Sequence, residues 1–157
     1  MAKLNIEIGG KLLLAKLPEL ASFLAAAGCH EYGSEGIVSD SEMEEILESH
    51  HNPATKCALG LYVDEEDYDP DAVKKLTVYC REQGLVLILD YHRDLDTDTM
   101  LEVHWPGLEV QHVWLDSNDS AVLSRSDLTG LARAGASIVD AIKSLDIPIT
   151  PKFEIYG

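Results

Sequence analysis

The sequence predicts an α+β fold in which helices pack on a mixed β-sheet. Short apolar runs bounded by glycine, proline and aspartate are typical of strands, and they alternate with longer stretches that carry helical spacing and capping residues. The length of 157 residues suits one domain with its own core. Because no linker, repeat or low-complexity segment interrupts the pattern, we expect a single globular domain over residues 1–157.

The first expected elements are a hairpin and a helix. Residues 4–8 alternate between apolar and polar side chains, as a half-buried strand does. Gly9 and Gly10 then suggest a two-residue turn into a second strand at 11–14. A helix is expected at about 17–27, with Pro18 in its first turn and Gly28 after its end.

A second, strongly acidic helix is expected from Asp40 or Ser41 to the pair His50 and His51. Ser41 and Glu44 have the spacing of a capping box. One face of the helix carries the apolar residues Met43, Ile46 and Leu47. We interpret the two histidines as a solvated helix end facing the negative pole of the dipole, with a metal site as the alternative.

A strand, a helix and a strand follow with short connections. Residues 56–63 are almost continuously apolar, which predicts a strand covered on both faces. Asp69 and Pro70 predict the start of a helix that continues to Gln83, and Gly84 predicts its end. With the strand at 85–90, these elements predict a parallel, right-handed βαβ unit.

The remaining chain is expected to form a hairpin, the longest helix and a last strand. Residues 100–105 and 108–115 should pair about Pro106 and Gly107. Ser124, Ser126 or Asp127 should cap a helix that extends through Gly135 to Leu145. Pro151 limits the strand at 152–156 to a sheet edge or a strand start. The element order from about 56 to 156 predicts a ferredoxin-like split βαβ core, preceded by the hairpin and two helices.

The negative charge is concentrated in the middle of the chain. The net charge is −16, and residues 31–119 alone hold 22 carboxylates against five lysines and arginines. Such a field repels nucleic acid and attracts basic proteins, so we expect no direct nucleic-acid binding. The apolar runs are shorter than the roughly 18 residues of a membrane helix, and the first residues do not form a secretory signal. We therefore expect a cytoplasmic protein that does not enter a membrane.

Three acidic segments are the candidate partner-binding residues. They lie on the expected second helix, in the loop after the strand at 56–63, and in the turn after the strand at 85–90: Glu42, Glu44, Glu45, Glu48, Asp64, Glu65, Glu66, Asp67, Asp94, Asp96 and Asp98. The last three have the spacing that opens a calcium loop, but Thr99 stands where that loop needs glycine and Trp105 where it needs glutamate. We interpret them as a solvated acidic turn.

Cysteine and histidine residues offer alternatives. Cys57 and Cys80 are expected to be buried and inert, while Cys29 beside His30 leaves a nucleophile as an alternative.

The strand histidines are His92, His104 and His112. His92 and His104 could face each other across a hairpin near Glu102 or Asp90, which would suit a metal or acid–base chemistry.

The leading hypothesis is a non-enzymatic acidic interaction protein of the inhibitor or immunity type. It would bind a basic surface of a nuclease, toxin or nucleic-acid-binding complex, with carboxylates replacing phosphates as in a DNA mimic and an anti-defence or anti-nuclease role. This hypothesis needs no cofactor, metal or catalytic residue. The second hypothesis is a homodimeric acidic secretion or assembly chaperone that uses a surface around Trp105 and Trp114. The third is a small enzyme or metal-binding protein that uses His92, His104 and His112.

Overall fold

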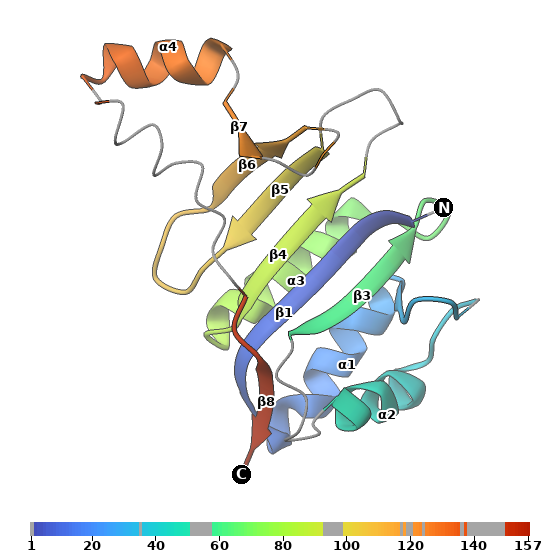
Figure 1. Ribbon diagram of the computed structural model, residues 1–157. Helices are drawn as coiled ribbons and strands as arrows, with labels where there is room; N and C mark the ends of the chain where they lie inside the picture. The colour runs from blue at the N-terminus through green and yellow to red at the C-terminus, as the bar shows by residue number, and fades with distance from the viewer. Residues whose placement is uncertain are drawn as a thin grey trace.

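The computed structural model is an α+β fold with helices packed on a mixed sheet, as the sequence predicts (Figure 1). It describes residues 2–34, 36–50, 58–92, 99–116, 118, 121–123, 125–135, 137 and 150–157. The strands are β1 (Ala2–Leu13), β2 (Cys29–His30), β3 (Leu59–Asp64), β4 (Val86–Tyr91), β5 (Thr99–His104), β6 (Gln111–Leu115), β7 (Ala121–Val122) and β8 (Phe153–Tyr156). The helices are the 3₁₀ helix η1 (Leu14–Lys16), α1 (Leu17–Ala26), α2 (Asp40–His50), α3 (Pro70–Glu82) and α4 (Arg125–Arg133).

Strand β1 lies in the middle of the sheet. The strand order is β2-β3-β1-β4-β5-β6-β7, and neighbours along it are antiparallel. Strand β8 pairs with the second half of β1 and is parallel to it. Because β3 and β4 are both antiparallel to β1, they run in the same direction, and β1 separates them. The βαβ connection is thus split by β1, while the ferredoxin-like assignment of residues 56–156 stays a prediction.

The predicted N-terminal hairpin is wrong, because Gly9 and Gly10 lie inside the continuous strand β1. Gly10 has φ +104°, a conformation that glycine adopts at no steric cost. At Gly9 the carbonyl oxygen of Pro151 comes so close that a Cβ would lie 2.1 Å from it. The glycines therefore let β1 exchange its partners β3 and β4 for β8, and they do not reverse the chain.

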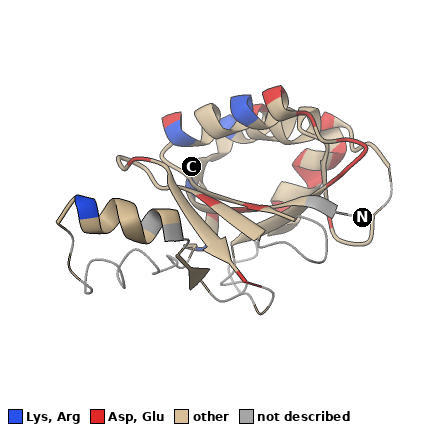
Figure 2. Ribbon diagram, turned by 90° about the horizontal axis from the view of Figure 1, so that it is seen from above, with Lys and Arg blue, Asp and Glu red and all other residues tan. Residues whose placement is uncertain are grey.

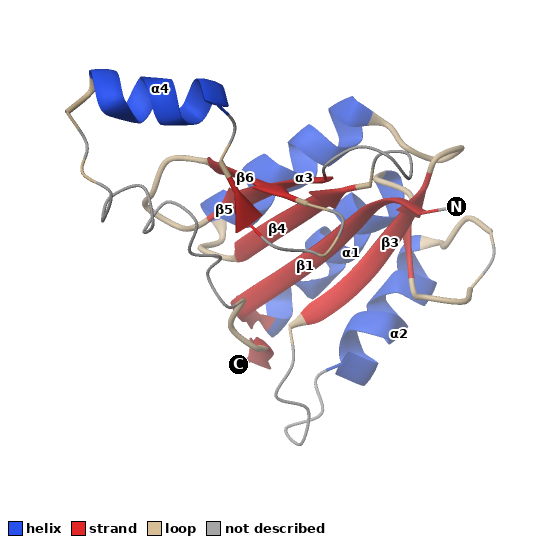
Figure 3. Ribbon diagram, turned by 45° about the horizontal axis from the view of Figure 1, so that its top comes forward, coloured by secondary structure: helices blue, strands red, loops and turns tan. Residues whose placement is uncertain are grey.

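Three helices cover one face of the sheet (Figures 1 and 3). The inward residues of β1, namely Leu4, Ile6 and Ile8, pack in one cluster with α1, α3 and the buried residues Met43 and Leu47 of α2. Helix α3 begins and ends where the sequence predicts: the Asp69 side chain accepts hydrogen bonds from the Asp71 and Ala72 amides, and Gly84 follows the helix with φ +71°. Among the described residues, no helix lies on the opposite face of β3, β1 and β4 (Figures 1 and 3), which we call the helix-free face.

A second core cluster lies on that opposite face, farther along the sheet. It contains Val86 and Ile88 of β4 with residues of β5 and β6: Leu101, Val103, Val113 and Leu115. Strand β4 therefore buries side chains on both faces. Strand β3, for which the same was expected, instead alternates between buried and more exposed residues, so that prediction is wrong. Gly60, Tyr62 and Asp64 are its outward positions.

The C-terminal part differs from the prediction at β7, which was not expected, and at helix α4. The hairpin of β5 and β6 forms about Pro106 and Gly107, and β8 starts two residues after Pro151, as expected. Helix α4, however, ends at Arg133, and Gly135 with φ +75° lies in the turn after it. The expected continuation through Gly135 is therefore wrong, and residues 138–149 lie outside the described part of the chain.

Candidate functional site

Helix α2 presents the first predicted acidic segment to solvent. Its inner face buries Met43 and Leu47, so the carboxylates lie on the other faces. Glu42, Glu45 and Glu48 are exposed, and Glu44 is half-buried. Figure 2 shows that carboxylates gather at the end of the molecule opposite α4, the end that includes α2 and β3.

Glu42 has a structural function besides its charge. Its Oε2 accepts hydrogen bonds from the Ser39 amide (2.8 Å) and hydroxyl (2.7 Å), while Ser39 Oγ accepts one from the Glu42 amide (3.3 Å). This is a capping box formed two residues earlier than the predicted pair Ser41 and Glu44. The backbone and hydroxyl hydrogen bonds from Ser39 lower the pKa of Glu42.

The second acidic segment follows β3. Glu65, Glu66 and Asp67 are exposed in the turn before α3. Asp64 differs, because its Oδ2 lies 3.1 Å from the Nε2 of the buried His30 on β2. The third predicted segment, with Asp94, Asp96 and Asp98, lies outside the described residues.

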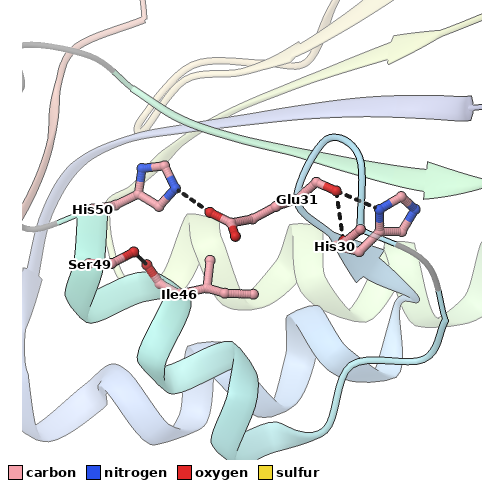
Figure 4. A network of polar contacts seen from close by, with 6 residues as sticks. His30, Glu31, Ile46, Ser49 and His50 are labelled. Atoms are coloured by element: carbon pink, nitrogen blue, oxygen red, sulfur yellow. Dashed lines mark hydrogen bonds and ion pairs between the residues drawn. The ribbon is translucent and has the colours of Figure 1, made fainter.

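A series of polar contacts connects the end of α2 with the end of β3, and Figure 4 shows the part that runs from His50 through Glu31 to His30. His50 Nε2 lies 3.3 Å from Glu31 Oε1. The Glu31 backbone carbonyl is 2.9 Å from His30 Nδ1, and His30 Nε2 faces Asp64. His50 thus ends α2 as predicted, with Glu31 as its partner; His51 lies outside the described residues. These contacts place two acidic segments beside β2, at one edge of the sheet.

Two exposed apolar side chains belong to the connection between β2 and α2. Tyr32 is 84% exposed and Ile37 is 86% exposed, the highest values among the large apolar residues described. Ile37 lines a groove of about 380 Å³ together with Val38, Ile46 and the carboxylates Glu42 and Glu45. We call the whole region the β2-edge surface: Glu31, Tyr32, Ile37, the α2 carboxylates Glu42, Glu44, Glu45 and Glu48, and the loop residues Asp64–Asp67.

A row of polar side chains crosses the helix-free face of the sheet next to this surface. The strand registers place His30 opposite Tyr62, Tyr62 opposite Asn5, and Asn5 opposite Asp90. Asn5 Nδ2 is 2.6 Å from His92 Nε2, which in turn lies 3.8 Å from Asp90 Oδ2. Sequence reasoning missed this row because alternation shows which residues share a strand face but not which strands are neighbours.

The strand histidines do not form the expected pair. The register of β4 and β5 places His104 opposite Leu87 on the helix-covered face, while His92 contacts Asn5 and Asp90 of the helix-free face. His92 and His104 therefore do not face each other. Instead, the buried His104 lies 2.5 Å from Glu102 Oε1, and His112 lies 3.5 Å from Oε2 of the same carboxylate.

No group of three or more histidine, cysteine, aspartate or glutamate side chains suited to a metal ion occurs among the described residues. Cys29 and Cys80 are buried, and burial raises the pKa of both thiols, that of Cys80 to about 12. A thiol with a raised pKa is a poor nucleophile, which disfavours the nucleophilic alternative for Cys29. Cys57 lies outside the described residues.

The two tryptophans occupy different environments. Trp105 packs against the second core cluster. Trp114 is half-buried and lines a cavity of about 390 Å³ with Val122, Leu123 and Leu131. The chaperone hypothesis, which uses a surface around Trp105 and Trp114, stays a prediction.

No helix among the described residues is long and apolar enough to cross a membrane. Comparison of the chain with protein-family models, with curated proteins and with solved structures finds no match.

Proposed function

We propose that the protein is a non-enzymatic acidic interaction protein, of the inhibitor or immunity type, which binds a basic surface of a partner protein through its β2-edge surface. The observation that carries the proposal is the chain of contacts from His50 through Glu31 and His30 to Asp64. It brings carboxylates from two separate segments to one edge of the sheet.

The charge of this region favours a basic partner. Residues 31–119 contain 22 carboxylates against five basic side chains, and the exposed carboxylates of α2 and of the loop after β3 lie in that range. Clustered charge of one sign accelerates association with an oppositely charged surface and repels wrong partners. It also repels phosphate, so the partner is a protein and not a nucleic acid.

The exposed apolar residues can contribute binding energy to an interface beyond the attraction between charges. Binding energy in protein interfaces is concentrated in a few apolar or aromatic side chains surrounded by polar ones. Tyr32 and Ile37 resemble this arrangement, since both are exposed, Tyr32 directly follows Glu31, and Ile37 lines a groove with Glu42 and Glu45. An excess of acid that served solubility alone would not require these two side chains to be exposed.

The function that follows is occupation of a basic site. Lysines and arginines that line the nucleic-acid channel of a nuclease or defence complex would face carboxylates in place of phosphates. The protein would thereby compete with nucleic acid, as an immunity protein or an anti-defence inhibitor does.

The test is the salt dependence and charge dependence of binding to a purified partner recovered from the native host. Two variants change the β2-edge surface: Glu45→Lys with Glu48→Lys, and Glu65→Lys with Glu66→Lys. The control combines Glu82→Lys with Glu109→Lys, two exposed carboxylates on other elements, and has the same net charge as each variant.

We expect both edge variants to slow association at least tenfold while the control keeps most of the rate, and we expect the rate to fall steeply with added salt. An association rate that does not change with the salt concentration would contradict the proposal. So would a control that weakens binding as much as the edge variants do.

A further inference from the structure

Two tyrosine rings meet at an angle on the β2-edge side of the sheet. The centroids of Tyr32 and Tyr62 are 5.3 Å apart and the planes are inclined by 54°. Tyr62 stands on the helix-free face of β3, half-buried, whereas Tyr32 in the loop after β2 is almost fully exposed. An exposed ring held against a second ring at such an angle leaves aromatic faces open to a ligand.

Two residues with hydrogen-bond acceptors lie next to Tyr62 on the same face of the sheet. Asp64 lies two residues after Tyr62, hence on the same face of β3, and its side chain is 39% exposed beside His30. Asn5 stands opposite Tyr62 on β1, and its Oδ1 is buried without a hydrogen-bond donor among the described residues. The site therefore combines aromatic faces with acceptors, a chemistry that suits a cation.

We propose that Tyr32, Tyr62 and Asp64 form a binding site for the guanidinium group of an arginine. The inference rests on the proposed function, since the arginine would belong to the basic surface of the partner. A guanidinium is flat, stacks on aromatic faces and donates two parallel hydrogen bonds to one carboxylate. A lysine ammonium is more strongly hydrated and lacks the planar fork, so the site prefers arginine.

A nucleobase does not fit the same surroundings. Stacking of a base on Tyr32 would bring its phosphate close to Asp64 and the following carboxylates Glu65 and Glu66, and like charges repel.

The test uses the isolated protein, so it does not depend on finding the partner. Two capped tripeptides, Gly-Arg-Gly and Gly-Lys-Gly, are titrated while backbone and tyrosine-ring NMR signals are recorded. We expect the arginine peptide to shift signals of Tyr32, Tyr62 and Asp64 and to bind more tightly than the lysine peptide. Tyr32→Ala and Asp64→Asn should each lower the affinity for the arginine peptide by about two- to fivefold, as expected for the loss of one exposed cation–π contact or ion pair.

Two controls separate this site from general charge attraction. Tyr156→Ala removes another exposed tyrosine, and Glu82→Gln removes another exposed carboxylate; both should bind the peptide as the wild type does. Thermal melts show whether each variant folds, and because Tyr32 is so exposed its loss should leave stability unchanged. Equal affinity for the two peptides, or equal weakening in the controls, would overturn the inference.

The binding results distinguish a failure of the arginine site from a failure of the proposed function. If the edge charge variants lose the partner but Tyr32→Ala and Asp64→Asn bind the partner and the arginine peptide normally, only the arginine site is wrong. If the arginine peptide binds as expected but the edge charge variants keep the partner, the arginine site stands and the proposed function is wrong.

Discussion

Replacement of Gly9 by alanine tests the close approach of residues 150–151 to β1. The new Cβ would lie 2.1 Å from the Pro151 carbonyl oxygen and 2.9 Å from Thr150 Cγ2. Real Cβ atoms essentially never lie closer than 3.0 Å to another heavy atom, so the Pro151 backbone must move by about 1 Å. Because the nearest atom belongs to the backbone and cannot rotate away, we expect a loss at the upper end of the range for overpacking, about 3 kcal/mol in the free energy of unfolding.

Gly60 provides a matched control in the next strand. It is exposed in β3, and a Cβ placed there meets no atom within 4 Å. Gly60→Ala should therefore be neutral or stabilising by about 0.5 kcal/mol, because alanine loses less backbone entropy on folding. Replacement of glycine by alanine should therefore lower the free energy of unfolding at Gly9 and leave it unchanged or raise it at Gly60.

Equilibrium urea unfolding, followed by tryptophan fluorescence and by circular dichroism, measures both changes. Hydrogen exchange gives a local readout, since the Gly10 amide donates to the Lys152 carbonyl (3.0 Å) and should exchange faster in Gly9→Ala. A Gly9→Ala protein within 1 kcal/mol of the wild type, with Gly10 still protected, would refute the packing described for this contact.

Two further predictions concern helix caps. Asp69→Ala removes the acceptor for the Asp71 and Ala72 amides and should lower the free energy of unfolding by about 1 kcal/mol, while Asp69→Asn should retain most of it; equal stabilities in urea unfolding would contradict the cap. Glu42→Gln should lower the melting temperature at pH 7, because the hydrogen bonds from Ser39 favour the carboxylate and lower its pKa from the usual 4.5. Because the pKa of Glu42 is lower in the folded protein, this stabilisation is present above pH 4.5 and is lost as the pH falls through the folded pKa. The melting temperatures of the wild type and Glu42→Gln should therefore converge in acid. A difference between them that stays constant with pH would contradict the role of the Glu42 carboxylate in the cap.

Features that depend on neighbouring residues could be predicted from the sequence. Helix α3 is the clearest case, since Asp69, Pro70 and Gly84 mark both ends, and its buried stripe follows from the spacing of Val73, Leu76 and Cys80. Helix α1 and the hairpin of β5 and β6 were predicted for similar reasons. The class, helices on a mixed sheet, follows from these local signals.

Features that depend on strand order could not be predicted. The pair Gly9 and Gly10 has the same local signature in a hairpin as in a strand that exchanges partners, and only the contact with Pro151 distinguishes the two. The expected pairing of His92 with His104 failed because it needs the register of β4 and β5.

Part of the candidate site could be predicted from the sequence. The acidity of α2 and of the loop after β3 is visible in the sequence. Their connection through His30 and Glu31, and the contact of Tyr32 with Tyr62, arise because the two-residue strand β2 pairs with β3, and such a short strand gives no periodic signal.

The central position of β1 has a consequence for how the chain folds. Its partners come from residues 59–64, 86–91 and 153–156, and the hydrogen bond between Thr150 and Glu7 joins residues 143 positions apart. Contacts between distant residues close large loops and slow folding. During synthesis the second half of β1 can therefore pair with β8 only after residues 153–156 have left the ribosome. A basic partner that bound the acidic segments early would meet a chain whose sheet is still incomplete on the β8 side.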